Sequence, residues 1–471
     1  MLKNLFAVKP VAPAPHVDAG EPVEGSLTGE ATLKRTLTAR QLVFLGVGAV
    51  IGAGIFVLSG QAAAAYAGPA VMLSFVIAGI ACAFAGLCYA EFAAMMPVSG
   101  SAYSYSYATL GEFVAWFIGW NLVLEYMFAA STVAVGWSGY LNSMLGNLGM
   151  ALPTALSQAP LNMVEGSLAY TGGIINLPAV LIIAAISGLC YVGITQSAMV
   201  NSVIVAIKVV VILLFLAFGA QYVNPDNWVP FIPENTGPGQ FGMDGVIRGA
   251  AVVFFAYIGF DAVSTAAGEA KNPQRDMPIG ILGSLVFCTI IYIAMAAVLT
   301  GMLPYPQLGT AKPVATVLEA YPSLLWLKWV VELGAIAGLS SVILVMLLGQ
   351  PRIFYSMSKD GLLPPFMAKI HPKHQTPYVG TIIVGVIAAV LAGFLPIGVL
   401  GDLVSMGTLL AFATVCIGVR GVWFVCIAGA AACLYLFWQP FKEHYTLMLG
   451  WTAIGMLIYF GYGYRHSNLR K

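Results

Sequence analysis

The chain has 471 residues, of which 60% are hydrophobic and only 8% are charged. A soluble protein covers much of its surface with charged side chains, so this composition excludes an ordinary soluble domain and indicates a protein that crosses a membrane several times. The net charge of +1 argues neither for nor against a nucleic-acid partner, and we expect none. The seven cysteines lie in apolar segments without paired spacing, which predicts neither a disulfide framework nor a metal site.

The first 40 residues are polar and proline-rich, and they lack the long apolar core of a signal peptide. We interpret them as a cytoplasmic tail. Twelve apolar segments of membrane-spanning length follow, so the sequence predicts an all-α membrane protein with twelve transmembrane helices in the lipid bilayer. The segments are 41–66, 69–96, 113–146, 175–194, 198–220, 246–268, 279–303, 327–357, 378–397, 400–419, 421–438 and 446–464.

Basic residues are concentrated in every second connection. If the N-terminus is inside, the outer connections hold only Arg248, Lys312, Lys328 and Lys442, and the inner ones hold most of the remaining Lys and Arg. The positive-inside rule therefore places both termini in the cytoplasm of a multi-pass protein of the cell membrane. All five histidines, His444 among them, are assigned to tails or loops, and we expect the pair His371 and His374 to be solvated.

The connection between the tenth and eleventh helices is unusually short. It must turn within residues 418–421, which is shorter than most helix connections. A single long helix would avoid this turn, but it would place the basic C-terminal residues Arg465, Arg470 and Lys471 outside. We therefore expect twelve helices with a tight turn at Arg420.

Two predicted helices are interrupted by glycines, the first at residues 51–56 and the sixth at residues 257–261. A broken helix inside a bilayer is tolerated only where its freed backbone groups meet protein, water or a ligand. The two breaks therefore indicate a binding site. Alternatively, glycines such as Gly46 and Gly52 form a ridge that lets helices pack closely.

The breaks lie five helices apart, and an odd offset inverts the second copy of a repeat in the membrane. Inverted repeats with broken helices in matching positions are a known transporter design. The sequence thus predicts two inverted five-helix repeats at 41–220 and 221–419, followed by two C-terminal helices and a tail at 420–471.

Four segments carry a resemblance to a known family. They are "GVGAVIGAGIF" at 46–56, "CYAEFAAMMPVSGSAYSYSYATLGE" at 88–112, "FFAYIGFDAVSTAAGEAKNPQRDMPIGI" at 254–281 and "GQPRIFYSMSKDGLLP" at 349–364. They resemble the amino acid/polyamine/organocation (APC) superfamily with its LeuT-like fold, and most of all the bacterial homologues of cationic amino acid transporters (CAT). The resemblance runs from about Leu33 to Val419, and the chain then departs from the family, which has a longer basic loop after the tenth helix.

The resemblance implies a substrate site at the two breaks. In the family, backbone amides bind the substrate carboxylate and backbone carbonyls bind its ammonium group, as the unpaired groups of helix ends can. Glycine permits close approach to the backbone. The matching amides are those of Ala53, Gly54 and Ile55, and the matching carbonyls are those of Val50, Phe255, Ala256 and Ile258.

Side-chain selectivity is expected from residues around the breaks. Glu125 and Asp261 are carboxylates deep enough in the membrane to meet a cationic side chain, and Met346 is a candidate pocket wall. Each also has a structural explanation: Asp261 as a helix cap, Glu125 as a hydrogen-bonding group in the bundle, and Met346 as packing.

Lys208 lies about ten residues into the fifth helix, too deep for its side chain to reach the interface. A lysine at this depth must find partners or lose its proton. In proton-coupled members of the family, a matching lysine lies near a carbonyl of the first helix that corresponds to Gly48. A purely structural hydrogen-bonding role is the alternative.

Two other classes of function fit the residues poorly. The spans contain no histidine and no carboxylate pair at ligand spacing, so we expect no enzyme, no catalytic residue and no cofactor other than a coupling proton. A channel would need a ring of pore-lining groups. We therefore expect a secondary amino acid transporter that works by alternating access, as a proton symporter of cationic or small neutral amino acids. An exchanger on the same fold, or a sensor that binds without flux, remains the alternative.

Overall fold

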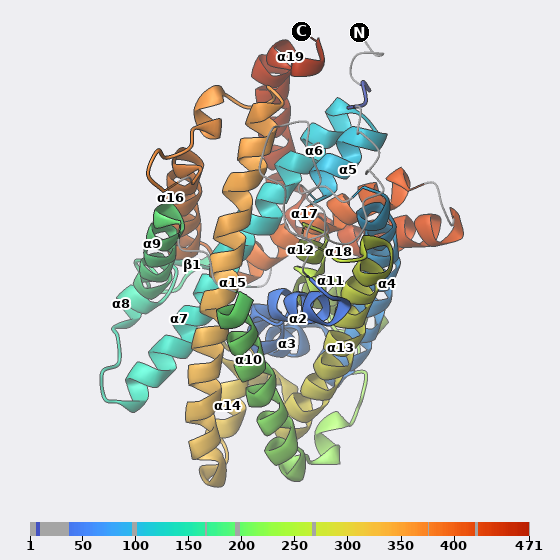
Figure 1. Cartoon of the computed structure of the whole chain (residues 1–471). Coiled ribbons are helices and arrows are strands. Elements are labelled where there is room, and N and C mark those ends of the chain that lie inside the picture. Colours follow the sequence, from blue (N-terminus) through green and yellow to red (C-terminus); the bar gives the residue numbers. More distant parts are fainter. Residues whose placement is uncertain are drawn as a thin grey trace.

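The computed structural model describes residues 6–9, 37–96, 101–164, 167–193, 198–265, 270–374, 376–419 and 423–470. These residues form a bundle of helices with one short antiparallel hairpin, β1 (Leu161–Val164) and β2 (Ser167–Tyr170). Most of the predicted N-terminal tail and the predicted turn at Arg420 lie outside the described residues. Figure 1 shows residues 6–9 and the C-terminal helix α19 at the same end of the bundle, which we call the terminal face; the other end is the opposite face.

Helices in the first part of the chain match the predicted segments closely. They are α2 (Ala39–Val50), the π-helix η1 (Gly54–Leu58), α3 (Ser59–Ala62), the π-helix η2 (Ala63–Ala67), the 3₁₀ turn η3 (Gly68–Ala70), α4 (Val71–Met95), α5 (Ser101–Thr109), α6 (Glu112–Val123), the π-helix η4 (Leu124–Phe128), α7 (Ala129–Asn147), α8 (Thr154–Ser157), α9 (Leu177–Val192) and α10 (Ala198–Gly219), followed by the 3₁₀ turns η5 (Ala220–Tyr222) and η6 (Pro225–Trp228). The short helix α5 was not predicted.

The second part of the chain holds α11 (Gly242–Val253), the 3₁₀ turn η7 (Phe254–Tyr257), α12 (Phe260–Thr265), α13 (Pro273–Met302), α14 (Pro313–Glu319), α15 (Leu325–Lys359), α16 (Tyr378–Phe394), α17 (Ile397–Gly418), α18 (Trp423–Ile458), the π-helix η12 (Tyr459–Gly463) and α19 (Tyr464–His466). The 3₁₀ turns η9 (Tyr305–Leu308), η10 (Pro322–Leu324), η11 (Pro365–Ala368) and η13 (Asn468–Arg470) lie in connections or at the end. The prediction missed α14.

Among the described residues, seven helical segments are long and apolar enough to cross a membrane: Gly54–Met95, Glu112–Asn147, Val203–Tyr222, Pro273–Met302, Pro322–Lys359, Ile397–Gly418 and Trp423–His466. The apolar helices α2, α9 and α16 are shorter. The outer surface of the bundle suits a lipid environment, since Val286 and Ile290 of α13 are about 60% exposed although both are large and apolar. This is an integral membrane protein.

The two predicted last helices are one hydrogen-bonded segment, α18, that changes direction at His444. The backbone there is not helical, with φ −120° and ψ 25°, and Pro440 one turn earlier lacks a backbone donor. The bend falls between the predicted segments 421–438 and 446–464. The histidine lies within this helical segment and is buried at 6% exposure, so its assignment to a loop was wrong.

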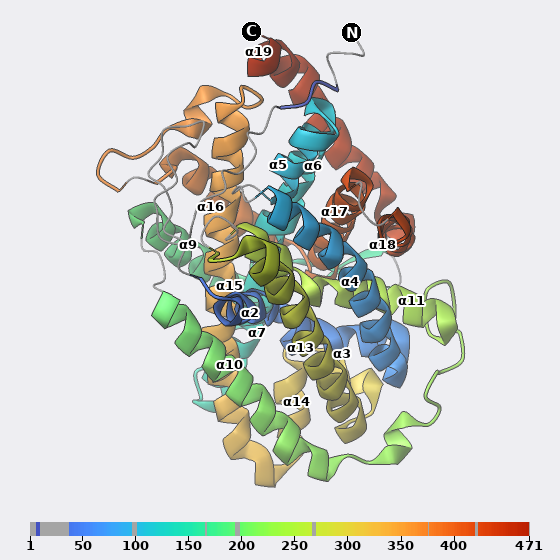
Figure 2. The ribbon, with the colours of Figure 1, turned by 45° about the vertical axis from the view of Figure 1, so that its right-hand side comes forward.

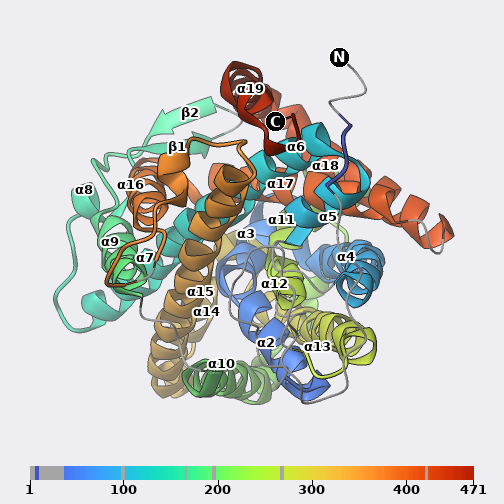
Figure 3. The ribbon, with the colours of Figure 1, turned by 45° about the horizontal axis from the view of Figure 1, so that its top comes forward.

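Both predicted breaks are present. After α2 the backbone of Ile51 is extended, with φ −72° and ψ 102°, and the helix resumes at η1. In the second break Ile258 is extended and Gly259 has φ +116°, a conformation that favours glycine. Figure 3 shows the two broken helices, α2 with α3 and α11 with α12, at the centre of the bundle and surrounded by α4, α13, α10, α15 and α17. Figure 2 shows α2 beside α10 and α13, against which it packs.

Both chain ends are attached to the terminal face. Lys9 forms an ion pair of 2.7 Å with Asp360 at the end of α15, and Tyr103 of α5 donates a hydrogen bond to the same carboxylate. Arg470 pairs with the buried Glu112 at 2.6 Å. The ends of the chain thus contact the helices that close this face.

At the opposite face, the short helix α14 is tied to the start of α15. Glu319 pairs with Lys312 at 2.6 Å and with Lys328 at 2.7 Å, and Lys328 also lies 3.7 Å from the fully buried Glu332. Burial acts to raise the pKa of the Glu319 carboxyl, but the hydrogen bonds and charges of Lys312 and Lys328 outweigh it, and the pKa is lowered.

A lowered carboxyl pKa means that Glu319 stabilises the fold above the ordinary carboxyl pKa and loses this contribution as the pH falls through the folded-state value. We therefore expect Glu319→Gln to lower the melting temperature of the detergent-solubilised protein by a few degrees at pH 7 and by less at pH 4. Thermal melting at both pH values checks this. Glu234→Gln, an exposed acidic position outside the network, is the control, and equal losses at both pH values would contradict the prediction.

Candidate functional site

The two helix breaks press directly against each other. A β-carbon built on Gly54 would lie 2.2 Å from Cα of Ala256, and one built on Gly259 would lie 2.8 Å from the carbonyl oxygen of Ala49. Real side chains do not approach so closely, so both contacts require glycine. Glycine at the breaks was predicted to let a substrate approach the backbone. In the structure Gly54 and Gly259 let the backbone of the first break lie directly against that of the second.

A small cavity lies at this crossing. It is lined by Ala49, Val50, Gly52, Ala53, Gly54, Ala129, Val133, Phe255, Ile258, Val342 and Met346. Its volume is about 10 Å³, roughly the room that one water molecule needs, so it must widen to admit anything larger. None of these lining residues is charged.

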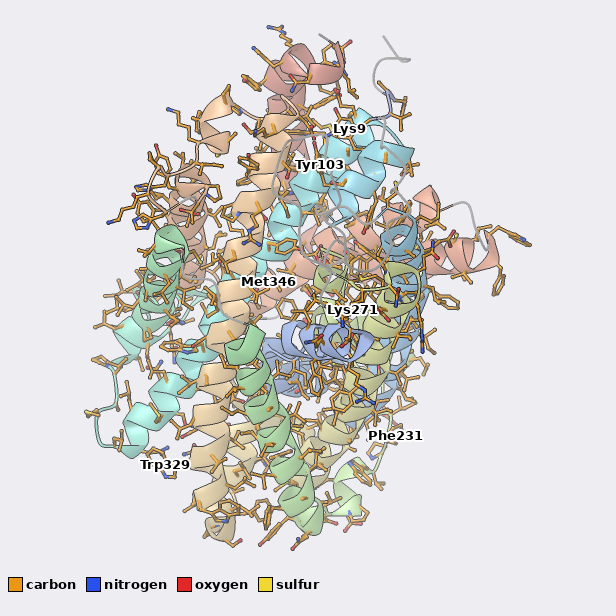
Figure 4. All side chains as sticks on the ribbon, in the orientation of Figure 1. Lys9, Tyr103, Phe231, Lys271, Trp329 and Met346 are labelled. Atoms are coloured by element: carbon orange, nitrogen blue, oxygen red, sulfur yellow. The ribbon has the colours of Figure 1, made fainter. Side chains whose placement is uncertain are left out.

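Six of the ten residues predicted to bind substrate line this cavity: Val50, Ala53, Gly54, Phe255, Ile258 and Met346. Met346 lies at mid-height on α15, beside the broken helices (Figure 4). Ile55 and Ala256 adjoin the lining residues in the chain. Glu125 and Asp261 do not line the cavity.

Backbone groups supply the polar atoms next to the cavity. The amides of Ala53, Gly54 and Ile55 lie where the second half of the first helix starts, and the first amides of a helix have no acceptor within it. The carbonyls of Val50 and Ala256 lie on the other side of the breaks. Backbone at the two breaks can thus offer donors to an anion and acceptors to a cation.

Tyr292 of α13 joins the two breaks, and the sequence analysis missed it. Its hydroxyl lies 2.9 Å from the carbonyl oxygens of both Val50 and Ala256. The signal in the sequence was a single tyrosine within the apolar run at 290–299. Because a carbonyl oxygen has two lone pairs, each of these carbonyls retains capacity for a second donor.

The predicted carboxylates lie together in a buried layer near the cavity. Glu125 and Asp261 are each 1% exposed, and Asp261 accepts a hydrogen bond of 3.1 Å from Tyr126. Glu125 lies beside Asp261 and Thr408. It lies in the π-helix η4, four residues before the cavity residue Ala129, and so one turn away on the same side.

Lys208 lies on α10, and its side chain contacts the C-terminal end of the first half-helix, α2. The side chain is 1% exposed, and Nζ donates to the carbonyl oxygens of Gly48 and Ile51, both at 3.1 Å. These carbonyls belong to the C-terminal end of α2, where a cation is favourable. The structure therefore places Lys208 on the predicted Gly48 carbonyl and on a second carbonyl at the break itself.

One cluster among the described residues has the composition of a metal site, but it lies elsewhere. Ligand atoms of Asp402, Glu443 and His444 lie within 4.8 Å of one another, and none of these residues lines the cavity. Both carboxylates already accept hydrogen bonds from Arg248. The arrangement is an ion-pair cluster centred on a guanidinium.

The family described as "Amino acid permease" matches residues 37–462 of the chain. The chain is 46% identical over 456 residues to the methylthioribose transporter of Bacillus subtilis, covering 93% of this chain and 96% of that protein. It is 46% identical over 461 residues to the branched-chain amino acid permease BcaP of the same organism, covering 94% and 96%. It is 38% identical over 390 residues to the vacuolar cationic amino acid transporter 4 of Arabidopsis thaliana, covering 83% of this chain and 63% of the relative.

These matches confirm the resemblance inferred from the sequence motifs, and they cover both helix breaks and the surrounding bundle. The named relatives are transporters and permeases, not enzymes. A membrane bundle with two broken helices at its centre, a cavity where these helices cross and near full-length similarity to permeases lead to one assignment: the chain belongs to the amino acid permease family.

Proposed function

We propose that the protein is a secondary active transporter that carries small neutral amino acids together with a proton across the cell membrane by alternating access. The observation that carries this proposal is the cavity where the two breaks meet, next to the first amides of the second half-helix and to the carbonyls that end the preceding segments. An amino acid is a zwitterion, so its carboxylate and ammonium group match these two sets of backbone groups.

The walls of the cavity favour an apolar substrate side chain. Ala129, Val133, Val342 and Met346 surround it without a polar group, and a charged side chain there would lose its hydration without a partner. The name of the branched-chain amino acid permease fits this chemistry. A relative of equal identity is named for methylthioribose, so the choice of substrate rests on the walls and not on the names.

Cationic amino acids are a second candidate, favoured by one observation. Glu125 lies one turn from the cavity residue Ala129, with Asp261 beside it, so a long cationic side chain would approach both. Relatives named cationic amino acid transporters are consistent with this. Two adjacent buried carboxyl groups cannot both be charged cheaply, so this layer also suits a proton.

Lys208 is the proposed coupling residue. A protonated ammonium holds the carbonyls of Gly48 and Ile51 and so joins α10 to the first broken helix. Without its proton the group loses both its charge and part of its donor capacity, and the contact weakens. Proton binding would thereby favour one arrangement of the broken helix. If the proton is not coupled, the same site would work as an exchanger or as a sensor.

The proposal includes the predicted architecture: twelve transmembrane helices, two inverted repeats and both termini in the cytoplasm. Breaks in the predicted first and sixth helices support the repeats. Lys9, Lys359 and Arg470 at the terminal face support a cytoplasmic position for that face. Uptake of radiolabelled alanine, valine, arginine and lysine into proteoliposomes, with and without an inward proton gradient, tests substrate class and coupling together. Gradient-independent uptake would exclude symport.

The first functional prediction concerns the crossing of the two breaks. We expect Gly54→Val to weaken substrate binding by about a hundredfold or more. The new side chain would collide with Ala256 and displace the amides, and so break at least two charge-assisted hydrogen bonds to the substrate of about 1.5–3 kcal/mol each. Isothermal titration calorimetry, which gives the substrate affinity of the purified protein, checks this. Gly188→Val is the matched control, because nothing lies within 4 Å of a β-carbon at Gly188. Near-normal affinity in Gly54→Val would contradict the site.

The second prediction concerns charge. If a substrate side chain reaches the carboxyl layer, Glu125→Gln should weaken arginine binding about tenfold more than valine binding, because an attraction to a partly buried charge is lost only for arginine. Competition against labelled substrate measures both. Equal losses would assign Glu125 to the fold or to the proton and leave the neutral substrate class in place.

The third prediction concerns coupling. We expect Lys208→Ala to abolish accumulation driven by a proton gradient while substrate binding stays within about threefold of the original, since the side chain contacts the break and not the cavity. Sodium should not restore accumulation. Lys442→Ala, at an exposed lysine, is the control. Undiminished accumulation by Lys208→Ala would show that the proton binds elsewhere.

A further inference from the structure

Arg248 lies at the centre of a buried ion-pair cluster at the opposite face. Its guanidinium is 1% exposed and binds Asp402 through two hydrogen bonds of 3.1 and 2.6 Å. It binds Glu443 through two more, both of 2.8 Å. His444 Nε2 lies 3.1 Å from Asp402 Oδ2, and the ring of Tyr66 lies 4.6 Å from the guanidinium carbon. Both edges of the guanidinium that can bind a carboxylate bidentately are therefore used.

The members of this cluster come from four elements. Arg248 lies on α11 and Tyr66 on η2, which are the halves of the two broken helices on this side of the cavity. Asp402 lies near the start of α17, and Glu443 and His444 lie at the bend of α18. The two half-helices are also joined directly, since the amide of Phe241 donates to the Tyr66 carbonyl at 2.7 Å. The cluster thus connects both halves to the surrounding bundle.

The charges of the cluster do not balance while His444 is neutral. Arg248 carries one positive charge against the two negative charges of Asp402 and Glu443, which leaves one negative charge in excess. A protonated His444 would cancel it. Other charged groups near the bend, Lys442 and Asp244, are exposed on the surface and make no contact with the cluster among the described residues.

We propose that Arg248 is a positioning residue that holds the two half-helices closed over the cavity, and that protonation of His444 strengthens this closure. The sidedness rests on the proposed function, in which this face is external. A neutral ring can donate Nε2–H to Asp402; a protonated ring keeps that hydrogen bond and adds an ionic attraction to the same carboxylate. Opening this face would separate Arg248 from its partners, so added attraction within the cluster opposes opening.

The position of the bend makes the proposal specific to this part of the fold. His444 is the one residue of α18 with non-helical backbone angles among those described. Its ring is aimed at α17 because the chain turns there, and Glu443 beside it reaches Arg248. The last two helices would therefore act on the opening of the cavity, although none of their described residues lines it.

Accessibility of the cavity tests this without relying on transport. Val133→Cys places a thiol in the cavity lining, and the seven native cysteines are buried. The rate of labelling by a membrane-impermeant thiol reagent, added to intact cells, is compared with and without His444→Gln at the same pH, so that the thiolate fraction cancels. We expect His444→Gln to raise the rate about threefold or more at pH 5.5, the effect of removing one partly buried ion pair, and to leave it unchanged at pH 8.

Two further variants sharpen the test. Lys442→Gln, next to the cluster in sequence and exposed, should leave the rate unchanged at both pH values. Glu443→Gln removes the excess negative charge, and the side chain is 40% exposed. It should therefore shift to lower pH the range in which acid slows the labelling of Val133→Cys. A merely structural role would not move this pH profile. Equal labelling of the Val133→Cys protein with and without His444→Gln at pH 5.5 would overturn the proposal.

The same labelling experiment tests the closure by the Arg248 cluster separately from the proposed function. If the pH effect is seen only when the reagent is added to inverted vesicles, the closure by Arg248 is supported and the proposed orientation is wrong. If the effect is seen in cells but no amino acid is taken up by proteoliposomes, the closure is again supported and the proposed substrate is wrong.

Discussion

The structure depends on one constraint: backbone groups released by a broken helix in an apolar surrounding must find partners. At the first break the carbonyl oxygens of Gly48 and Ile51 accept hydrogen bonds from Lys208, and that of Val50 accepts one from Tyr292. Both donors come from α10 and α13, the helices against which α2 packs. Ala53 and Gly54, at the start of the second half-helix, line the cavity instead. Protein thus completes the carbonyl side of the break, and under the proposed function a ligand completes the amide side.

This asymmetry links binding to conformation. A ligand that occupies the amides and adds a donor to the Val50 carbonyl would share that carbonyl with Tyr292, which also holds Ala256 in the second break. Lys208 acts on the same half-helix two residues away. Substrate and proton would therefore act on one short piece of backbone, which is a physical basis for coupling because each favours a particular position of α2.

Part of this arrangement could be predicted from the sequence. Glycine runs marked both breaks, and apolar length marked the helices, because these signals are local in the chain. The contact of Lys208 with Gly48 came from the family resemblance. Tyr292 could not be predicted, since a tyrosine in an apolar run has no local sign of its partners. Arg248, Asp402 and His444 are separated by long stretches of sequence, so only the folded chain brings their charges together.

The contact of Gly54 with Ala256 has a mechanical consequence. Since no atom can be inserted between these residues, and both are buried, the two broken helices meet at a point that cannot compress. Relative motion of the half-helices would then be a swivel about this pivot, with small displacements near it and larger ones toward the ends. A ligand held at the pivot would stay almost in place while distant residues such as Arg248 travel furthest, so a modest rotation could exchange the side from which the cavity is reached.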